Sequence, residues 1–174
     1  MPISLHAATV PSMLQILGSM TGLLDKLEAH CAQHGVDASA LIGAKLAEDM
    51  KPFAYQISSC AWHSAHAIEG VRAGVFAPDF TPPPADVAGL RVCLERARTL
   101  LLAVTEEEME AFIGKPMRFE VGDFRLDFRA ENFLLSFSQP NFCFHATTAY
   151  DILRAQGLGI GKLDFLGQMR VVAK

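Results

Sequence analysis

The chain has 174 residues, of which 51% are hydrophobic and 20% are charged, and its formal net charge is −4. This length suits a single domain spanning 1–174, and the apolar content excludes a disordered chain, because burial of apolar surface can offset the entropy lost on ordering. Lys and Arg form no basic stripe, so we expect no nucleic-acid partner.

The N-terminal segment predicts a long helix from Ser4 to His34, ended by Gly35. Residues 1–24 contain no Asp, Glu, Lys or Arg, and apolar residues recur there at steps of three and four. Pro11 should kink this helix or mark its true start. Polar residues such as Gln15 interrupt the apolar run, so we expect neither a signal peptide nor contact with a membrane.

The middle of the chain predicts two further helices. The second spans roughly Ala40 to Ala73, with Pro52 inside it or at the start of its main segment. A proline-rich connection, 75–84, leads to a third helix from about Ala85 to Val104. Thr105, followed three residues later by Glu108, predicts the N-terminus of a short helix that ends at Gly114.

The alternation of apolar and polar residues over 117–128, around Gly122-Asp123, predicts a β-hairpin with one apolar face against the helices. A fourth helix is expected from about Ala130 to Gln156, with a kink near Pro140, followed by a glycine-rich tail. The pattern therefore indicates an all-α four-helix bundle with a hairpin inserted between helices three and four.

Three stretches lack charged residues: 1–24, 52–68 and 132–150. A helix with a solvated face should show a charge every turn, so these stretches should be buried against other helices or a second subunit. Because monomers seldom expose large apolar patches, we expect a homodimer. The four cysteines form no CxxC pair, which fits a reducing, cytoplasmic location.

Polar residues inside the uncharged helices are the candidate site. On the second predicted helix they are Asp49, Gln56 and His63, and on the fourth they are Asn141, His145 and Thr148. Each set shares one helix face by its spacing. Since burying such groups without partners costs roughly 1–3 kcal/mol each, the two faces should meet each other, water or a ligand.

Several chemistries are compatible with these side chains. His145 and His63 could bind a divalent metal such as zinc or nickel between facing helices, although neither of them belongs to a His-x-x-x-His or Glu-x-x-His pair. A histidine could instead act as a general base, or simply bond to a carbonyl group in the core. Catalysis by Cys60 or Cys143 is less favoured, because nothing nearby lowers a thiol pKa.

The sequence is similar to a bacterial family known as a domain of unknown function, numbered nineteen ninety-three. The resemblance covers essentially the whole chain and is carried by 4–11, 46–50, 52, 140–150, 152–154, 157, 161–162 and 164–167. That family resembles the DinB-like superfamily, which implies an up-down four-helix bundle. Many DinB-like proteins bind a divalent metal through three histidines, two of them at i, i+4 on the last helix.

His145 matches one of those ligands, but Asn141 and Ala149 stand four residues before and after it. The resemblance therefore implies an incomplete metal triad. The first hypothesis is a small-molecule binding protein whose pocket is lined by the six polar residues. The second is a divalent-metal-dependent enzyme of the thiol-transferase or hydrolase type. A non-catalytic interaction protein is the third.

Overall fold

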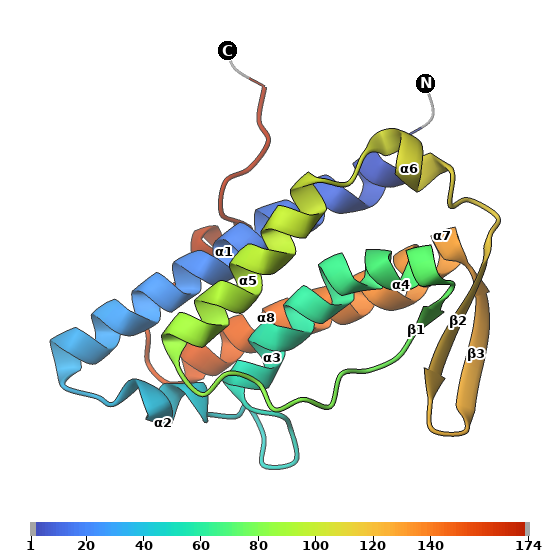
Figure 1. Ribbon diagram of the computed structural model, residues 1–174. Coiled ribbons are helices and arrows are strands. Elements are labelled where there is room, and N and C mark those ends of the chain that lie inside the picture. Colours follow the sequence, from blue (N-terminus) through green and yellow to red (C-terminus); the bar gives the residue numbers. More distant parts are fainter. Residues whose placement is uncertain (1–2, 173–174) are drawn as a thin grey trace.

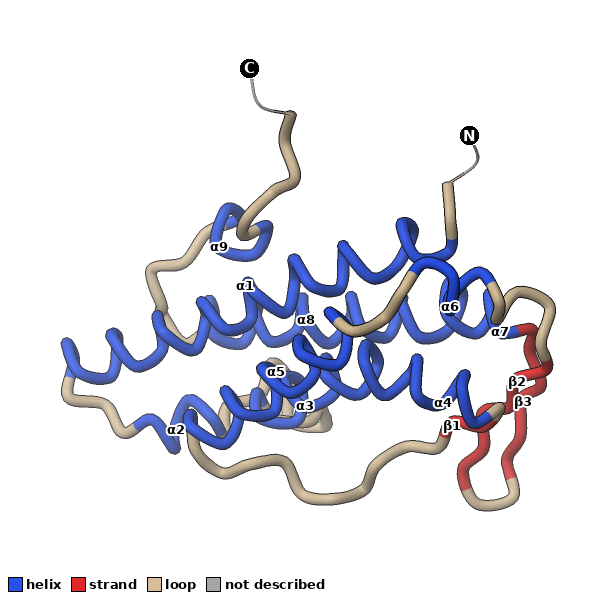
Figure 2. Tube along the Cα trace, turned by 45° about the horizontal axis from the view of Figure 1, so that its top comes forward, coloured by secondary structure: helices blue, strands red, loops and turns tan. Residues whose placement is uncertain are grey.

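The computed structural model describes residues 3–172, which fold mostly into helices with a small three-stranded sheet at one end (Figure 1; Figure 2). Residues 1, 2, 173 and 174 of the expected domain lie outside the described part. Two π-helical turns join α3 to α4 and α7 to α8. The elements are α1 (Leu5–His34), α2 (Ala38–Ile42), α3 (Phe53–Ala61), the turn Trp62–His66, α4 (Ala67–Ala73), β1 (Val75–Phe76), α5 (Val87–Leu102), α6 (Glu106–Glu110), β2 (Pro116–Val121), β3 (Phe124–Arg129), α7 (Ala130–Asn132), the turn Phe133–Ser138, α8 (Gln139–Ala155) and α9 (Lys162–Leu166).

The long helices bury their apolar faces against one another. α1 packs on α5 and α8, and α3 packs on the same two helices. Leu17, Ile57 and Leu94 have no exposed surface, and each such side chain contributes roughly 1.5–3 kcal/mol by leaving water. The mostly helical fold predicted from the sequence is confirmed.

The first helix begins and ends as its sequence predicts. Ser4 Oγ accepts a hydrogen bond from the Ala7 amide, and Gly35 ends the helix with a φ of 64°. Pro11 lies inside the helix and does not mark its start. By length and hydropathy α1 would suit a membrane span, but 44% of its most apolar stretch is buried in this structure and Leu24 is fully buried in the core.

The expected second helix from Ala40 to Ala73 is wrong before Pro52, whereas Pro52 does begin its main segment, which ends at Ala73 as expected. Residues 38–42 form the separate helix α2, 43–52 form a loop, and α3 begins only at Phe53. Pro52 has an extended backbone, with a ψ of 169°, and its ring leaves it without an amide hydrogen to continue a helix. Asp49 therefore lies on an exposed loop and shares no helix face with Gln56 and His63.

The segment 75–84 is more than a connection, because it begins with strand β1. β1 pairs in parallel with β2, through Val75 with Arg118 and Phe76 with Phe119. The strand lies so close to α4 that a Cβ atom on Gly70 would come within 2.9 Å of Phe76 Cβ. Glycine at position 70 thus permits the sheet to pack on the helix.

The predicted hairpin is confirmed, with β2 and β3 paired antiparallel around Gly122 and Asp123. Met117 and Phe119 on β2 are buried, as expected for a face packed on the helices. The β3 side is more open than expected, since Phe124 is 55% exposed. β2 therefore supplies most of the contact with the core.

The fourth predicted helix is interrupted where the kink near Pro140 was expected. Residues 133–138 form a π-helical turn, and Pro140 stands in the first turn of α8. Pro140 cannot donate the hydrogen bond of a regular α-helix, and a π turn is one way in which a helix accommodates such a break. This π turn places Phe137 and Ser138 on the side that faces the first π turn, Trp62–His66.

One side-chain hydrogen bond links the two π turns. Ser138 is fully buried, and its Oγ donates to the carbonyl oxygen of His63 at 2.8 Å. Polar groups freed by irregular helix geometry need such partners when they are buried. This bond connects the two helical stretches that carry His63 and His145.

Ser138→Ala should lower the free energy of unfolding by about 1–3 kcal/mol, because it leaves the buried His63 carbonyl without its donor. Chemical denaturation measures the change. Ser136→Ala is the matched control: its hydroxyl is exposed and bonds only to the Asn132 carbonyl on the same helical stretch. The control should stay within about 0.5 kcal/mol of the wild type. Equal effects of the two substitutions would contradict a structural role for the bond between the turns.

Candidate functional site

Gln56 occupies the first turn of α3, where its side chain can reach back to the loop before the helix. Its Nε2 donates to the carbonyl oxygen of Lys51 at 2.9 Å, and Gln56 is only 2% exposed. A carbonyl oxygen can only accept, so this contact fixes which end of the amide carries the nitrogen. Gln56 Oε1 consequently faces α8.

On α8, His145 meets that oxygen, with Nδ1 at 2.7 Å from Gln56 Oε1. Because an amide oxygen only accepts, Nδ1 must carry the hydrogen. The neutral ring then has a bare acceptor at Nε2, and no described residue donates a hydrogen bond to it. Gln56 thus sets the tautomer of His145, as partners of functional histidines commonly do.

His63, from the first π turn, lies beside His145. The two ring centroids are 5.6 Å apart and the planes differ by 16°. Burial, followed by the neighbouring His145, lowers the pKa of His63 to about 3, and burial lowers the pKa of His145 to about 4. Both rings are therefore neutral at pH 7. Nδ1 of His63 is buried without a hydrogen-bond partner among the described residues.

The histidine pair lines a partly enclosed cavity of about 230 Å³. One wall comes from α3 and the first π turn, and the opposite wall comes from Phe137, Asn141 and His145 around α8. The segment 76–83 closes a further side; Figure 1 shows this connection running past α3 on its way from β1 to α5. The volume corresponds to roughly eight water molecules, which suits a small organic molecule.

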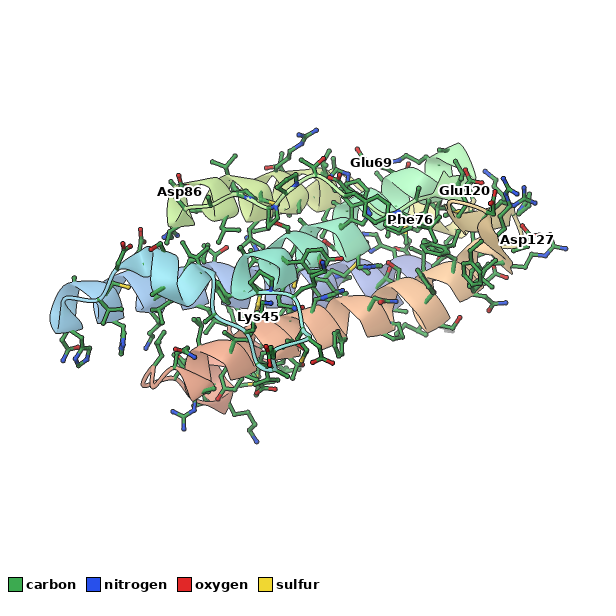
Figure 3. All side chains as sticks on the ribbon, turned by 90° about the horizontal axis from the view of Figure 1, so that it is seen from below. Lys45, Glu69, Phe76, Asp86, Glu120 and Asp127 are labelled. Atoms are coloured by element: carbon green, nitrogen blue, oxygen red, sulfur yellow. The ribbon has the colours of Figure 1, made fainter. Side chains whose placement is uncertain are left out.

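Aromatic side chains make up much of the lining. Phe76 is 3% exposed and packs near Trp62, His63 and Phe133, with ring centroids 5.3–5.9 Å apart. Figure 3 shows Phe76 in a crowded region between α4 and the hairpin. The other aromatic residues of the lining are Tyr55, Phe119 and Phe137.

The polar residues predicted from the sequence divide into three groups. His63, Asn141 and His145 line the cavity, and Gln56 stands behind His145 as its hydrogen-bond partner. Asn141 Nδ2 donates to the Phe137 carbonyl, which leaves Oδ1 as an acceptor. Thr148 is buried further along α8 and is not among the cavity walls, and Asp49 is exposed on its loop.

A larger hollow, an open groove of about 810 Å³, lies between α1, α5 and the tail after α9. None of the six predicted residues lines it, and its described walls contain no histidine or cysteine. The smaller cavity therefore holds the chemistry that the sequence singled out.

The donor set does not fit a resident catalytic metal. In the described part of the chain, no three His, Cys, Asp or Glu side chains gather in a way that could hold an ion. Catalytic zinc sites use three protein ligands, whereas here two nearly parallel imidazoles stand together without a third such donor among the described residues. The two-histidine metal site remains a prediction.

Sequence reasoning missed the walls that come from outside the two helix faces. Tyr55, Ser58, Ser59 and Trp62 line the cavity from α3 and the π turn, and Asp79 does so from the proline-rich segment. The signal that could have indicated Asp79 is its place among prolines, since a rigid loop is a common carrier of binding residues. No pattern in the sequence indicates the two-residue strand that brings this segment to the cavity.

The fold and the cavity define a mostly helical protein with a neutral histidine pair between two of its helices. The DUF1993 family, described as a domain of unknown function, matches residues 5–166, and the chain belongs to this family. No curated protein shows significant similarity to the chain.

Among solved structures, the chain is similar to a DinB family member protein from Shewanella denitrificans. The two share 25% sequence identity, and the TM-score is 0.82 over 98% of this chain and 96% of that one. This similarity supports the DinB-like superfamily, as the sequence motifs predicted. It does not assign an activity.

Burial of the two neutral imidazoles predicts a pH-dependent stability. In the unfolded chain a histidine titrates near pH 6.5, so below that pH the unfolded state binds protons that the folded state does not. The contribution of the two histidines to stability should be constant above about pH 7 and fall as the pH drops toward 4, by at most about 1.4 kcal/mol per pH unit for each histidine. His63→Phe should reduce this slope between pH 6 and pH 4.5, measured by urea denaturation, and leave the curve parallel to wild type above pH 7. An unchanged slope in the acid range would contradict burial of a neutral His63.

The hydrogen bond from His145 Nδ1 to Gln56 Oε1 predicts the tautomer of His145. Long-range ¹H–¹⁵N correlation spectra at pH 7 should show His145 protonated at Nδ1 in the wild type. Gln56→Leu removes the acceptor, so signal from the Nε2–H form should appear and stability should drop by about 1–3 kcal/mol. A wild-type spectrum dominated by the Nε2–H form would contradict the arrangement described above.

Proposed function

We propose that this protein binds a small organic molecule in the cavity between α3, the 76–83 segment and α8. The observation that carries the proposal is the bare Nε2 of His145, which Gln56 holds as an acceptor in a wall of that cavity. A ligand with a hydroxyl or N–H group would complete this bond. Aromatic walls with a few fixed polar groups are typical of small-molecule sites.

Binding is favoured over catalysis by the burial of His145 and by the lack of a suitable nucleophile or metal site among the described residues. A general base works best when its pKa lies near the operating pH, whereas burial lowers the pKa of His145 to about 4. The thiols offer no alternative nucleophile, because burial raises the pKa of Cys60 and Cys143 is exposed and outside the cavity lining. The metal-dependent transferase or hydrolase alternative lacks a third ligand in the described residues.

The remaining expectations stand as parts of this proposal. We propose an up-down four-helix bundle of the DinB type, which the packing of α1 and α3 on both α5 and α8 supports. A cytoplasmic location is consistent with the free state of all four cysteines. A homodimer is supported by the apolar side chains exposed along the last long helical stretch, such as Leu135 and Phe144.

A fragment screen tests the binding function, with Trp62 as the reporter. Trp62 is the single tryptophan of the chain and lines the cavity, so its fluorescence should respond to a bound molecule. We expect fragments with a hydrogen-bond donor to bind, and His145→Phe to weaken them at least about tenfold through loss of the acceptor. His34→Phe, a substitution on the exposed end of α1, is the matched control. Absence of any response at millimolar fragment concentrations, or equal losses in both variants, would overturn the proposal.

A further inference from the structure

Of the described residues that line the cavity, none is Lys or Arg, and Asp79 supplies a carboxylate. Asp79 is exposed at the edge of the cavity, and its Oδ1 accepts the Thr81 amide at 2.8 Å. The Thr81 side chain and amide together lower the pKa of the Asp79 carboxyl, so it is ionised at pH 7. The two histidines add no positive charge, because burial keeps both neutral. The formal charge of the lining is thus negative.

The aromatic walls, like the negative lining, favour a positively charged ligand. Tyr55, Trp62, Phe76, Phe119 and Phe137 line the cavity, and the faces of such rings attract cations. Tyr55 already shows this attraction, since Lys51 Nζ lies 5.7 Å from the centroid of its ring. Lys51 itself does not belong to the cavity lining.

The segment that carries Asp79 is held in place before any ligand arrives. Trp62 Nε1 donates to the carbonyl oxygen of Ala77 at 3.2 Å, which ties the segment to the first π turn. Pro78, Pro82 and Pro83 fix φ at three further positions. A carboxylate positioned in advance loses little entropy on binding.

From these observations we infer that the cavity takes a protonated organic amine, whose N–H groups donate to His145 Nε2 and to the Asp79 carboxylate while the aromatic walls surround its apolar part. This inference rests on the proposed small-molecule function and names the ligand class of the same cavity. A neutral alcohol could bond to His145 as well, but it would gain neither the attraction of a cation to the ring faces nor the full attraction of Asp79. An anion would meet Asp79 without a compensating cation.

Benzylammonium and benzyl alcohol form a matched pair of probes, because they share size and shape and differ in charge. We expect benzylammonium to bind the full chain at least tenfold more tightly, as measured by Trp62 fluorescence and by calorimetry. Asp79→Asn should bring the two affinities within about threefold of each other, since one charge-assisted bond accounts for about a factor of ten. Asparagine keeps the oxygen that accepts the Thr81 amide, so the segment should keep its shape.

Asp123→Asn is the control, because it removes an exposed carboxylate at the hairpin turn, outside the cavity lining. It should leave the tenfold preference unchanged. Equal affinity of the two probes for the wild type, or a preference for benzyl alcohol, would overturn the amine inference while small-molecule binding stands. A preference that survives Asp79→Asn would overturn the role of Asp79. Failure of both probes and of every screened fragment would overturn the binding function itself.

Discussion

The hydrogen bond from His145 Nδ1 to Gln56 Oε1 joins the packing of the helices to the chemistry of the cavity. It connects α3 to α8, and its direction is set by the Lys51 carbonyl, which takes the amide nitrogen of Gln56. Because the chain Lys51–Gln56–His145 has one consistent arrangement of donors and acceptors, the ring can present only an acceptor to the cavity. The hydrogen-bonding character that His145 presents to the cavity is therefore set outside the cavity, at the start of α3.

Most of the helical fold follows from local patterns in the sequence. The three- and four-residue apolar steps of α1, the Thr105 cap and the alternation around Gly122 are all local, and each is confirmed by the structure. The loop 43–52 was missed because apolar and charged residues there still follow a helical period, and Pro52 decides the break. β1 was missed because a strand of two residues exists only through its pairing with β2.

The candidate site was predictable where buried polar groups had to find partners. The predicted polar residues of the two helical stretches do converge: Gln56 and His63 from one, Asn141 and His145 from the other. They do so because stretches without charged residues are buried, and their polar groups cannot bond to water there. Asp49 did not join them, because the shared face was inferred from a helix that the loop replaces. Trp62 and Asp79 were not predicted, since their place depends on the π turn and on the path of 76–83 rather than on spacing within one helix.

The two π turns make the site sensitive to the number of residues in the chain. Each π turn holds one residue more than an α-helical turn would, and a single residue advances a helix by about 100°. Loss of one residue from 133–138 would therefore rotate α8 relative to α7 and the hairpin, and Ser138 would no longer face the His63 carbonyl. Side chains in these turns can vary within the limits of packing, whereas insertions and deletions would dismantle the cavity. Homologues that keep this cavity should align without gaps across both turns, even where their residues differ.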